Sequence, residues 1–162
     1  MKTASVDFGK LSLNQVLSFR INRLSAALGR QASVILEKES NLSLVEWRLL
    51  RLLADVQGSC ARDLNRVSGM NPALISRGIR RLENRQLIAS KRDEHDRRTH
   101  RLKLTPEGQR LYEQTLPVMG RRHEALWNSL SEEERASLLT ILDKLDEHAQ
   151  VLEFPEKTDS KI

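Results

Sequence analysis

The amino-acid sequence predicts a mainly α-helical protein that carries one small β-hairpin. Its 162 residues are 39% hydrophobic but only 4% aromatic, a balance that favours helices over a strand-rich sandwich or barrel. Apolar residues recur at helical spacing over most of the chain, and one segment, 87–105, has the alternation typical of strands. The length suits one ordinary globular domain with tightly joined parts.

The first predicted helix is long and amphipathic. Its apolar residues lie three, four or seven positions apart, which predicts a helix from about residue 11 to residue 39. Ser43 and Glu46 then have the spacing of a capping box, in which each side chain binds the other residue's backbone amide. A second helix is therefore expected over residues 44–55.

Two further helices follow in close succession. A short third helix is expected to begin at Ser59 or Cys60 and to end at Ser68-Gly69. Asn71-Pro72 combines a favoured N-cap with a proline at the first helical position, where the missing amide costs nothing. The fourth helix is therefore expected from Pro72 to about Arg85.

A hairpin and two helices complete the predicted elements. Residues 87–92 and 101–105 predict two antiparallel strands, separated by the charged segment DEHDRRTH. Thr105-Pro106 predicts the start of a helix, in which Pro117 is expected to cause a kink. A second capping box, Ser131 to Glu134, predicts the last helix.

The net charge is concentrated in the middle of the chain. Residues 58–105 hold 12 basic and 5 acidic side chains (+7), whereas residues 106–162 hold 7 and 12 (−5). A basic segment beside an acidic one is typical of a polyanion-binding module with its own scaffold. A solvated charged face is the alternative that composition leaves open.

The third and fourth predicted helices have the arrangement of a helix-turn-helix. At 100° per residue, Ile75, Ile79 and Leu82 share one face of the fourth helix, and Arg77 and Arg80 lie on the opposite face. Because arginine can bind guanine O6 and N7 together, Arg77 and Arg80 are the candidates for contacts to base edges. The small residues Ala73 and Ser76 would let the helix N-terminus enter a major groove, and Arg81 is expected to contact the DNA backbone.

The charged hairpin adds a second DNA-binding element. Arg97 and Arg98 at its tip are suited to a narrow, electronegative minor groove. Asp96 would repel phosphate, so it is expected to stabilise the tip by accepting hydrogen bonds from Arg97, Arg98 or turn amides. An ordinary solvated turn is the alternative for Arg97 and Arg98, but a reader helix combined with a basic wing is a more specific pattern than either part alone.

Several segments resemble the MarR family of bacterial transcription regulators, over about residues 13–148. The matching segments, in order, are Leu42-Ser-Leu-Val-Glu-Trp47, Asp63-Leu64, Pro72-Ala-Leu-Ile-Ser-Arg77, Arg81-Leu-Glu83, Leu87-Ile88, Asp96-Arg97-Arg98, Leu104-Thr105-Pro106-Glu107-Gly108 and Ser131-Glu-Glu-Glu-Arg135. The resemblance implies a winged helix-turn-helix homodimer that binds a pseudo-palindromic operator in double-stranded DNA. It also implies a repressor, which a small effector, aromatic or phenolic, releases from DNA.

The resemblance also assigns roles along the chain. Residues 1–41 are expected to form an N-terminal dimerisation helix, 42–105 the DNA-binding region, 106–154 the C-terminal dimerisation helices and 155–162 a frayed tail. The positions that match the family's reader helix and minor-groove arginine are Ala73, Leu74, Ser76, Arg77 and Arg97 or Arg98.

One position departs from the family pattern. Where the family has glycine before the first wing strand, this chain has Gln86. Since glycine there supplies a left-handed helix terminus, Gln86 is expected either to adopt that costlier conformation or to end the helix differently.

Other kinds of site have weaker support in the sequence. Phe19, Trp47 and Trp127 are candidates for an effector pocket, although large aromatics at helical spacing are more often core residues. Cys60, the only cysteine, is more simply a small helix-start residue than a redox sensor.

Whole classes of function are not expected. The four histidines are dispersed, so neither a metal nor another cofactor is expected. No phosphate-binding loop or nucleophile motif suggests an enzyme, and no segment suggests a membrane span or signal peptide, so a cytoplasmic protein is expected. A winged-helix module that binds protein or RNA remains the alternative to a DNA-binding regulator.

Overall fold

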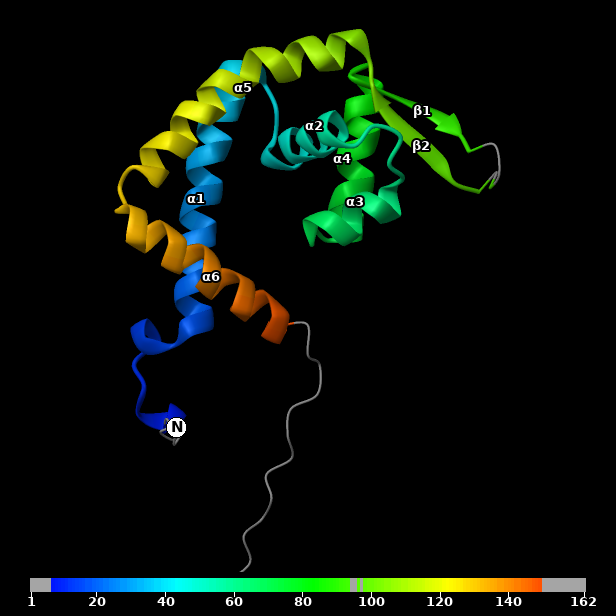
Figure 1. Cartoon of the computed structure of the whole chain (residues 1–162). Coiled ribbons are helices and arrows are strands. Elements are labelled where there is room, and N and C mark those ends of the chain that lie inside the picture. Colours follow the sequence, from blue (N-terminus) through cyan, green and yellow to red (C-terminus); the bar gives the residue numbers. More distant parts are fainter. Residues whose placement is uncertain (1–6, 94–95, 97, 150–162) are drawn as a thin grey trace, which may run out of the picture. The chain divides into compact units, whose positions relative to one another are not determined.

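The computed structural model describes residues 7–93, 96 and 98–149 and confirms a mainly helical fold with one β-hairpin (Figure 1). The described α-helices are α1 (Leu17–Ser40), α2 (Leu44–Asp55), α3 (Ala61–Ser68), α4 (Pro72–Asn84), α5 (Pro106–Trp127) and α6 (Glu132–Ala149). The hairpin strands β1 (Ile88–Arg92) and β2 (His100–Leu104) lie between α4 and α5 in the chain. The chain divides into two compact units, Met1–Met119 and Gly120–Ile162, with the boundary inside α5.

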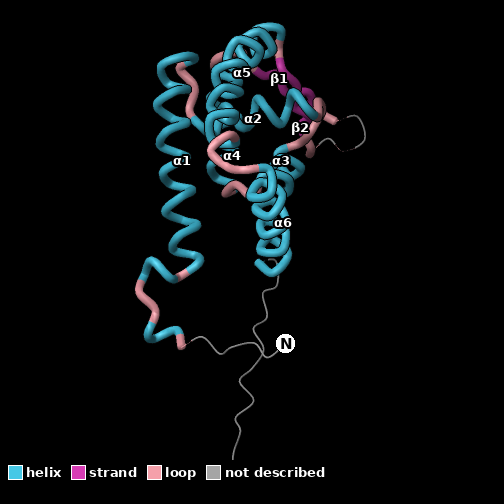
Figure 2. The backbone as a smooth tube through the Cα atoms, turned by 60° about the vertical axis from the view of Figure 1, so that its left-hand side comes forward, coloured by secondary structure: helices cyan, strands magenta, loops and turns pink. Residues whose placement is uncertain are grey.

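The predicted start of the first helix, at about residue 11, is wrong. Helix α1 begins at Leu17, and short 3-10 turns at Phe8–Lys10 and Leu13–Gln15 precede it (Figure 2). The carboxamide of Gln15 accepts hydrogen bonds from the backbone amide of Ser12 (2.9 Å) and from its hydroxyl (3.0 Å). This local cap closes a separate turn. The apolar residues before Leu17 therefore keep a helical spacing although they lie outside α1.

The other predicted helix starts are confirmed, because side chains satisfy the free amides of the first turns. These hydrogen bonds are Glu46 N to Ser43 Oγ (3.2 Å) and Ser43 N to Glu46 Oε2 (2.7 Å) at α2, Cys60 N to Asp63 Oδ2 (3.0 Å) at α3, Ala73 N to Asn71 Oδ1 (2.8 Å) at α4, Gly108 N to Thr105 Oγ1 (3.0 Å) at α5, and Glu134 N to Ser131 Oγ (3.2 Å) at α6. Helix α5 continues through Pro117. The predicted frayed tail lies outside the described residues.

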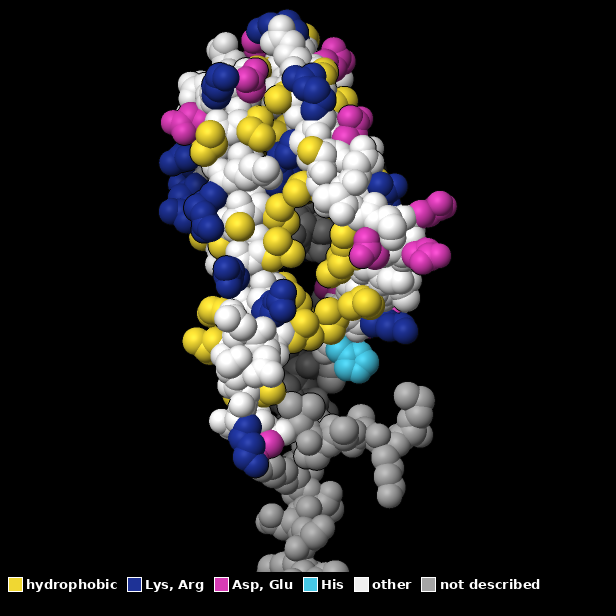
Figure 3. Space-filling model, turned by 90° about the vertical axis from the view of Figure 1, so that its left-hand side faces the viewer, with side chains coloured by type: hydrophobic (Ala, Val, Ile, Leu, Met, Phe, Trp, Pro, Cys, Tyr) yellow, Lys and Arg dark blue, Asp and Glu magenta, His cyan; other side chains and the backbone are white. Residues whose placement is uncertain are grey.

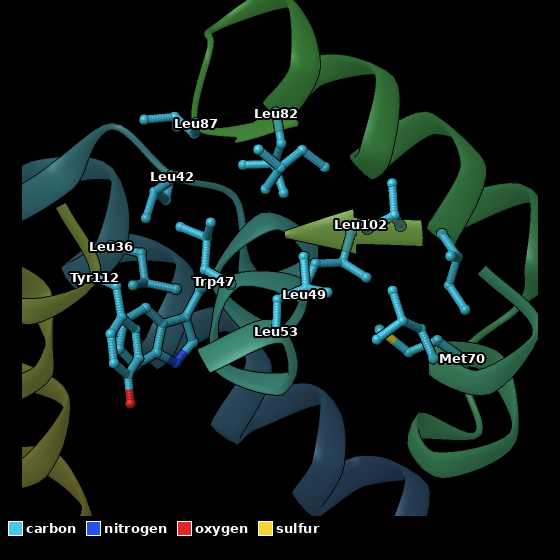
Figure 4. Packing of buried hydrophobic residues seen from close by; sticks show 14 residues of the cluster. Leu36, Leu42, Trp47, Leu49, Leu53, Met70, Leu82, Leu87, Leu102 and Tyr112 are labelled. Carbon is cyan, nitrogen blue, oxygen red and sulfur yellow. The ribbon is translucent and has the colours of Figure 1, made fainter. Parts of the chain in front are cut away.

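Helix α2 forms the centre of the first unit's core. Its Leu49, Leu50 and Leu53 have no exposed surface and pack in one cluster with residues of α1, α3, α4, the hairpin and α5 (Figure 4). Gly78 permits the contact between α4 and α2, since a β-carbon there would lie 2.7 Å from Leu49 Cδ1. The close packing fixes α4 on α2 with its apolar face inward.

The hairpin is joined to the helical core through its second strand. Strands β1 and β2 pair antiparallel, from Ile88 opposite Leu104 to Arg92 opposite His100. The backbone of Leu102 also pairs with the segment before α3, donating to Ser59 O (3.0 Å) and accepting from Gly58 N (2.9 Å). The root of the hairpin is therefore fixed on both sides of β2.

Gln86 adopts the left-handed conformation, with φ 57°, so the first of the two expected alternatives is confirmed. The amide of Leu87 donates to Leu82 O (2.9 Å) and that of Gln86 to Glu83 O (2.8 Å), the two hydrogen bonds of a Schellman motif. Leu82 and Leu87 are both buried and supply the hydrophobic contact that accompanies this motif. Helix α4 therefore ends as the family's glycine would end it.

Leu87 also marks where α5 meets the hairpin. Its carbonyl accepts a hydrogen bond from the Thr105 amide (3.1 Å), and a β-carbon on Gly108 would lie 1.8 Å from the same oxygen. Only glycine fits at position 108 without a shift of the backbone.

The second unit consists of the end of α5 and α6. Arg135 of α6 closes the turn between them by donating from Nε to Trp127 O (2.8 Å) and from Nη2 to Asn128 Oδ1 (3.1 Å). Its guanidinium lies over the Trp127 ring at 5.5 Å, and His123 stacks on that ring with a centroid distance of 5.6 Å. These contacts are local to the turn.

Helices α1 and α6 each expose apolar side chains. Those on α1 are Leu17, Phe19, Ile21, Leu24 and Val34, and those on α6 are Leu138, Leu139, Ile141 and Leu142. A space-filling view shows hydrophobic side chains at the surface among basic ones (Figure 3). None of the described helices is long and apolar enough to cross a membrane.

Candidate nucleic-acid interface

Helix α4 has one buried face and one exposed face, as its sequence periodicity predicts. Ile75, Gly78 and Leu82 are buried against the core. The predicted reader-helix side chains are all exposed: Ala73, Leu74, Ser76, Arg77, Arg80 and Arg81. Packing on α2 thus presents the polar face of α4 to the surrounding solvent.

The arginines of α4 are largely free of internal partners. Arg77 donates from Nε to the Ala73 carbonyl (3.3 Å), one turn earlier on the same helix. Arg80 and Arg81 make no hydrogen bond or ion pair with the described residues. Their guanidinium groups can therefore bind an external acceptor without first breaking an internal contact.

The turn before α4 holds it in a helix-turn-helix arrangement with α3. Gly69 ends α3 in the left-handed conformation (φ 61°), and the Asn65 carboxamide donates to the Met70 carbonyl (2.6 Å). Asn71 then caps α4, and Met70 is buried beneath the turn. The N-terminus of α4, with its partial positive charge, remains exposed.

The tip of the hairpin is organised by Asp96. Its carboxylate accepts hydrogen bonds from the Arg98 amide (3.0 Å) and the Thr99 hydroxyl (2.7 Å). The Thr99 hydroxyl, followed by the Arg98 amide, lowers the pKa of Asp96 below its usual value. These contacts fix the backbone at Arg98, whose side chain is exposed, whereas Arg97 lies outside the described residues.

A groove runs between α4, the start of α3 and the hairpin. Three exposed arginines line it, Arg62 from α3, Arg80 from α4 and Arg98 from the tip, and Glu83 is the one acidic residue among the lining residues that the structure describes. Its volume is about 810 Å³. Arg62 could not be predicted as part of this groove from the sequence, because only the folded hairpin brings Arg98 to the same groove as α3.

A second residue that could not be predicted from the sequence is Arg101, near the tip end of β2. Its guanidinium pairs with Asp93 on β1's side of the hairpin and lies 3.7 Å from Asp63 of α3. Asp93 raises the pKa of Arg101 through a hydrogen bond and its charge. Asp63 is distant in the sequence from the other two residues, and the +7 charge of the segment gave no sign of this pairing.

The three aromatic candidates for an effector pocket have different surroundings. Trp47 is buried in the core and stacks on Tyr112 of α5 with a centroid distance of 5.5 Å. Phe19 on α1 is 38% exposed, and Trp127 belongs to the turn of the second unit. The structure therefore gives Trp47 a packing role.

A pocket of about 570 Å³ lies elsewhere in the first unit. It is lined by residues from the end of α1, the start of α2 and the end of α4, among them Glu37, Glu46, Arg81 and Arg85. Arg85 donates to the Asn41 carbonyl (2.8 Å) and lies 3.8 Å from Glu46. Its lining is more polar than the aromatic pocket that the sequence suggested.

Cys60 lies at the start of α3. Cys60 is the N-cap residue of α3, as its place in the sequence suggested. Among the described residues, no group of three or more His, Cys, Asp or Glu side chains is arranged to hold a metal ion.

Comparison with known proteins identifies one family. The model of the MarR family matches residues 42–100, from the start of α2 to the hairpin. A curated relative, the HTH-type transcriptional regulator FarR of Neisseria gonorrhoeae, is 32% identical over 114 residues, which are 70% of this chain and 75% of FarR.

Solved structures share the fold. A MarR/EmrR family transcriptional regulator from Acinetobacter sp. ADP1 has a TM-score of 0.80 at 24% identity, covering 86% of this chain and 98% of its own. BpsR of Bordetella bronchiseptica, whose DNA binding is regulated by 6-hydroxynicotinic acid, has a TM-score of 0.66 at 24% identity, covering 78% and 98%.

Proposed function

The chain belongs to the MarR family of DNA-binding transcription regulators, and from this membership we propose that it works as a homodimeric repressor of a pseudo-palindromic operator. In each subunit α4 lies in a major groove, and the hairpin, here called the wing, reaches the adjacent minor groove. The two subunits occupy half-sites about one helical turn apart.

One observation carries this proposal. Arg80 of α4, Arg62 of α3 and Arg98 of the wing line the same groove, and Arg80 has no partner among the described residues. A helix face and a wing that present unoccupied guanidinium groups together match the two grooves of a DNA duplex.

The contacts divide by the chemistry of each side chain. Arg77 and Arg80 bind base edges, and the small Ala73 and Ser76 let the helix approach them. Leu74 packs against the groove wall, and Arg81 binds phosphate. Arg98, with Arg97, enters the minor groove, where a narrow groove concentrates negative potential.

The exposed apolar faces of α1 and α6 support a dimer. Two helices that leave so many large hydrophobic side chains in solvent need a partner to cover them. We assign residues 1–41 and 106–154 to dimerisation and 42–105 to DNA binding.

A small effector releases the protein from DNA in this proposal. The support is the membership in the family and the fold shared with BpsR, whose DNA binding 6-hydroxynicotinic acid regulates. An aromatic or phenolic compound is therefore the effector class to test first. The protein acts without catalysis, and it acts in the cytoplasm, where bacterial DNA is.

Selection of bound sequences from a random duplex pool tests the function. The expected result is an enriched inverted repeat, whose binding, followed by fluorescence anisotropy, weakens steeply with salt as phosphate contacts release counterions. Arg77→Glu should abolish this binding and leave the dimer intact in size-exclusion chromatography. The matched control is Arg48→Glu, which reverses a charge on an exposed position of α2.

Other outcomes would count against the proposal. Salt-sensitive binding without an enriched motif would indicate only a non-specific basic surface. Absence of duplex binding at low salt would favour the alternative of a winged-helix module for protein or RNA.

A further inference from the structure

A chain of hydrogen bonds and ion pairs runs from the start of α3 to the tip of the wing, with Arg101 in the middle. Resting on the function proposed above, we propose that Arg101 is a positioning residue for DNA recognition: it holds the wing at the place where Arg98 reaches the minor groove. It acts through Arg98 and does not itself contact DNA.

Arg101 makes three contacts in different directions. Its Nε pairs with Asp93, its Nη1 lies 3.7 Å from Asp63, and the same nitrogen donates to the carbonyl of Gly58 (3.3 Å). Asp93 follows β1, Gly58 precedes α3 and Asp63 lies in its first turn. One guanidinium therefore ties both strands of the wing to the helix-turn-helix.

The chain continues from Asp93 to the tip. The second carboxylate oxygen of Asp93 accepts a hydrogen bond from the Asp96 amide (3.0 Å). Asp96 in turn accepts from the Arg98 amide (3.0 Å) and the Thr99 hydroxyl. Each link fixes the next, so the backbone at Arg98 is positioned relative to Arg101.

The other end of the chain is the cap of α3. Asp63 accepts a hydrogen bond from the Cys60 amide (3.0 Å), and this bond lowers its pKa below the usual value. Because α3 packs against α4, these contacts also set the position of the wing relative to the helix that carries Arg77 and Arg80.

The local charge argues against a direct DNA contact by Arg101. Two carboxylates share its guanidinium, and the side chain of Asp93 is only 13% exposed. A phosphate oxygen would have to displace one of them and would meet the negative charge of both. Lysine cannot replace this arginine, because a single ammonium lacks the planar fork that spans several acceptors.

A double-mutant cycle with Arg98 tests the positioning role on the full-length protein and its selected operator. Arg98→Ala and Arg101→Ala are each expected to weaken operator binding about tenfold. The double variant should bind no more weakly than Arg98→Ala alone. Once the Arg98 contact is removed, misplacing the wing removes no further contact with DNA. Arg101→Lys keeps the charge and should still bind as weakly as Arg101→Ala.

Asp93→Asn tests the positioning role by the direction in which operator binding changes. Removal of a negative charge near DNA should strengthen binding if only long-range electrostatics matter. The positioning role predicts the reverse, weaker binding by several-fold, since the amide holds Arg101 less strongly than the carboxylate. The matched control is Arg110→Ala, which breaks a similar arginine–carboxylate pair with Glu107 on α5 and should leave operator binding unchanged.

The outcomes separate cleanly once circular dichroism shows that each variant is folded. Additive losses in the cycle, wild-type binding by Arg101→Lys or tighter binding by Asp93→Asn would each overturn the positioning role. So would an Arg98→Ala variant that binds like wild type. If the wild-type protein selects no operator, the proposed function itself fails.

Discussion

Gln86 holds a backbone angle that costs most residues energy. A left-handed conformation is unfavourable by about 1–2 kcal/mol for a residue with a β-carbon, and glycine avoids that cost. In this chain the Schellman hydrogen bonds and the buried pair Leu82 and Leu87 hold Gln86 there. The conformation is thus imposed by its neighbours, and the exposed side chain of Gln86 contributes little to it.

Gln86→Gly should therefore stabilise the protein, by about 0.5–1 kcal/mol after the greater entropy of glycine in the unfolded chain is counted. Urea unfolding followed by circular dichroism measures the change. Gln86→Ala keeps the β-carbon and should change stability by less than about 0.5 kcal/mol. Equal effects of the two substitutions would show that the side chain, and not the backbone, matters.

Asp96 offers a test at the tip of the wing. Thr99→Val removes the hydroxyl that chiefly lowers the pKa of Asp96, so the pKa should rise toward its ordinary value of 3.8. A carboxyl whose pKa is lowered in the folded protein stabilises the fold. This stabilisation is present above pH 3.8 and is lost as the pH falls through the lowered pKa. NMR titration of the Asp96 carboxyl measures both midpoints, and an unchanged midpoint in Thr99→Val would refute the assignment.

At the scale of elements, glycines decide how closely the helices and the wing approach. Gly78 lets α4 lie on α2, and Gly108 lets the first turn of α5 lie on the Leu87 carbonyl. The neighbour of Gly108 is backbone, which cannot move aside at low cost, whereas the neighbours of Gly78 are side chains.

Gly108→Ala should destabilise the fold by about 2–4 kcal/mol, because its β-carbon would overlap a backbone carbonyl. Gly120→Ala is the control in the same helix, since no described atom lies within 4 Å of that β-carbon. This second change should stabilise α5 by about 0.5–1 kcal/mol, through helix propensity. Thermal unfolding of both variants checks the expected opposite signs.

Local signals predicted most of the elements. Ser43, Asn71, Thr105 and Ser131 gave the helix starts because a cap depends on residues within one turn. The start of α1 was wrong because the apolar stripe continues through a 3-10 turn that Ser12 and Gln15 close locally.

The site was predicted only in part. The periodicity of α4 correctly placed its exposed face, since that depends on one helix alone. The place of Arg62 in the groove and the contacts of Arg101 depend on how the wing folds back on α3, which no local pattern encodes. The buried stacking of Trp47 on Tyr112 likewise joins distant segments.

At the scale of the whole molecule, the exposed apolar surface of α6 supports the proposed dimer. Leu138, Ile141 and Leu142 lie within one narrow stripe at 100° per residue, and Thr140 lies on the opposite side of the helix. Large apolar side chains in this number are stable in water when another surface covers them.

Ile141→Glu is expected to convert the dimer to a monomer and to weaken operator binding at least tenfold, because a single half-site loses the gain of linked binding. Light scattering after size-exclusion chromatography measures the mass. Thr140→Glu introduces the same charge at the preceding position in the chain, which lies on the other side of the helix, and should leave the dimer intact. A monomeric Thr140→Glu, or a dimeric Ile141→Glu, would contradict the assignment of this face.

The contact between Gly108 and the Leu87 carbonyl also forms a mechanical joint. Because the first turn of α5 lies against the backbone from which β1 departs, this turn and the start of β1 are held together. Only Thr105 links β2 to α5, so no slack loop separates the second strand from the helix. The first turn of α5 and the base of the wing therefore form one rigid corner, and a change in the direction of either would require the other to change with it.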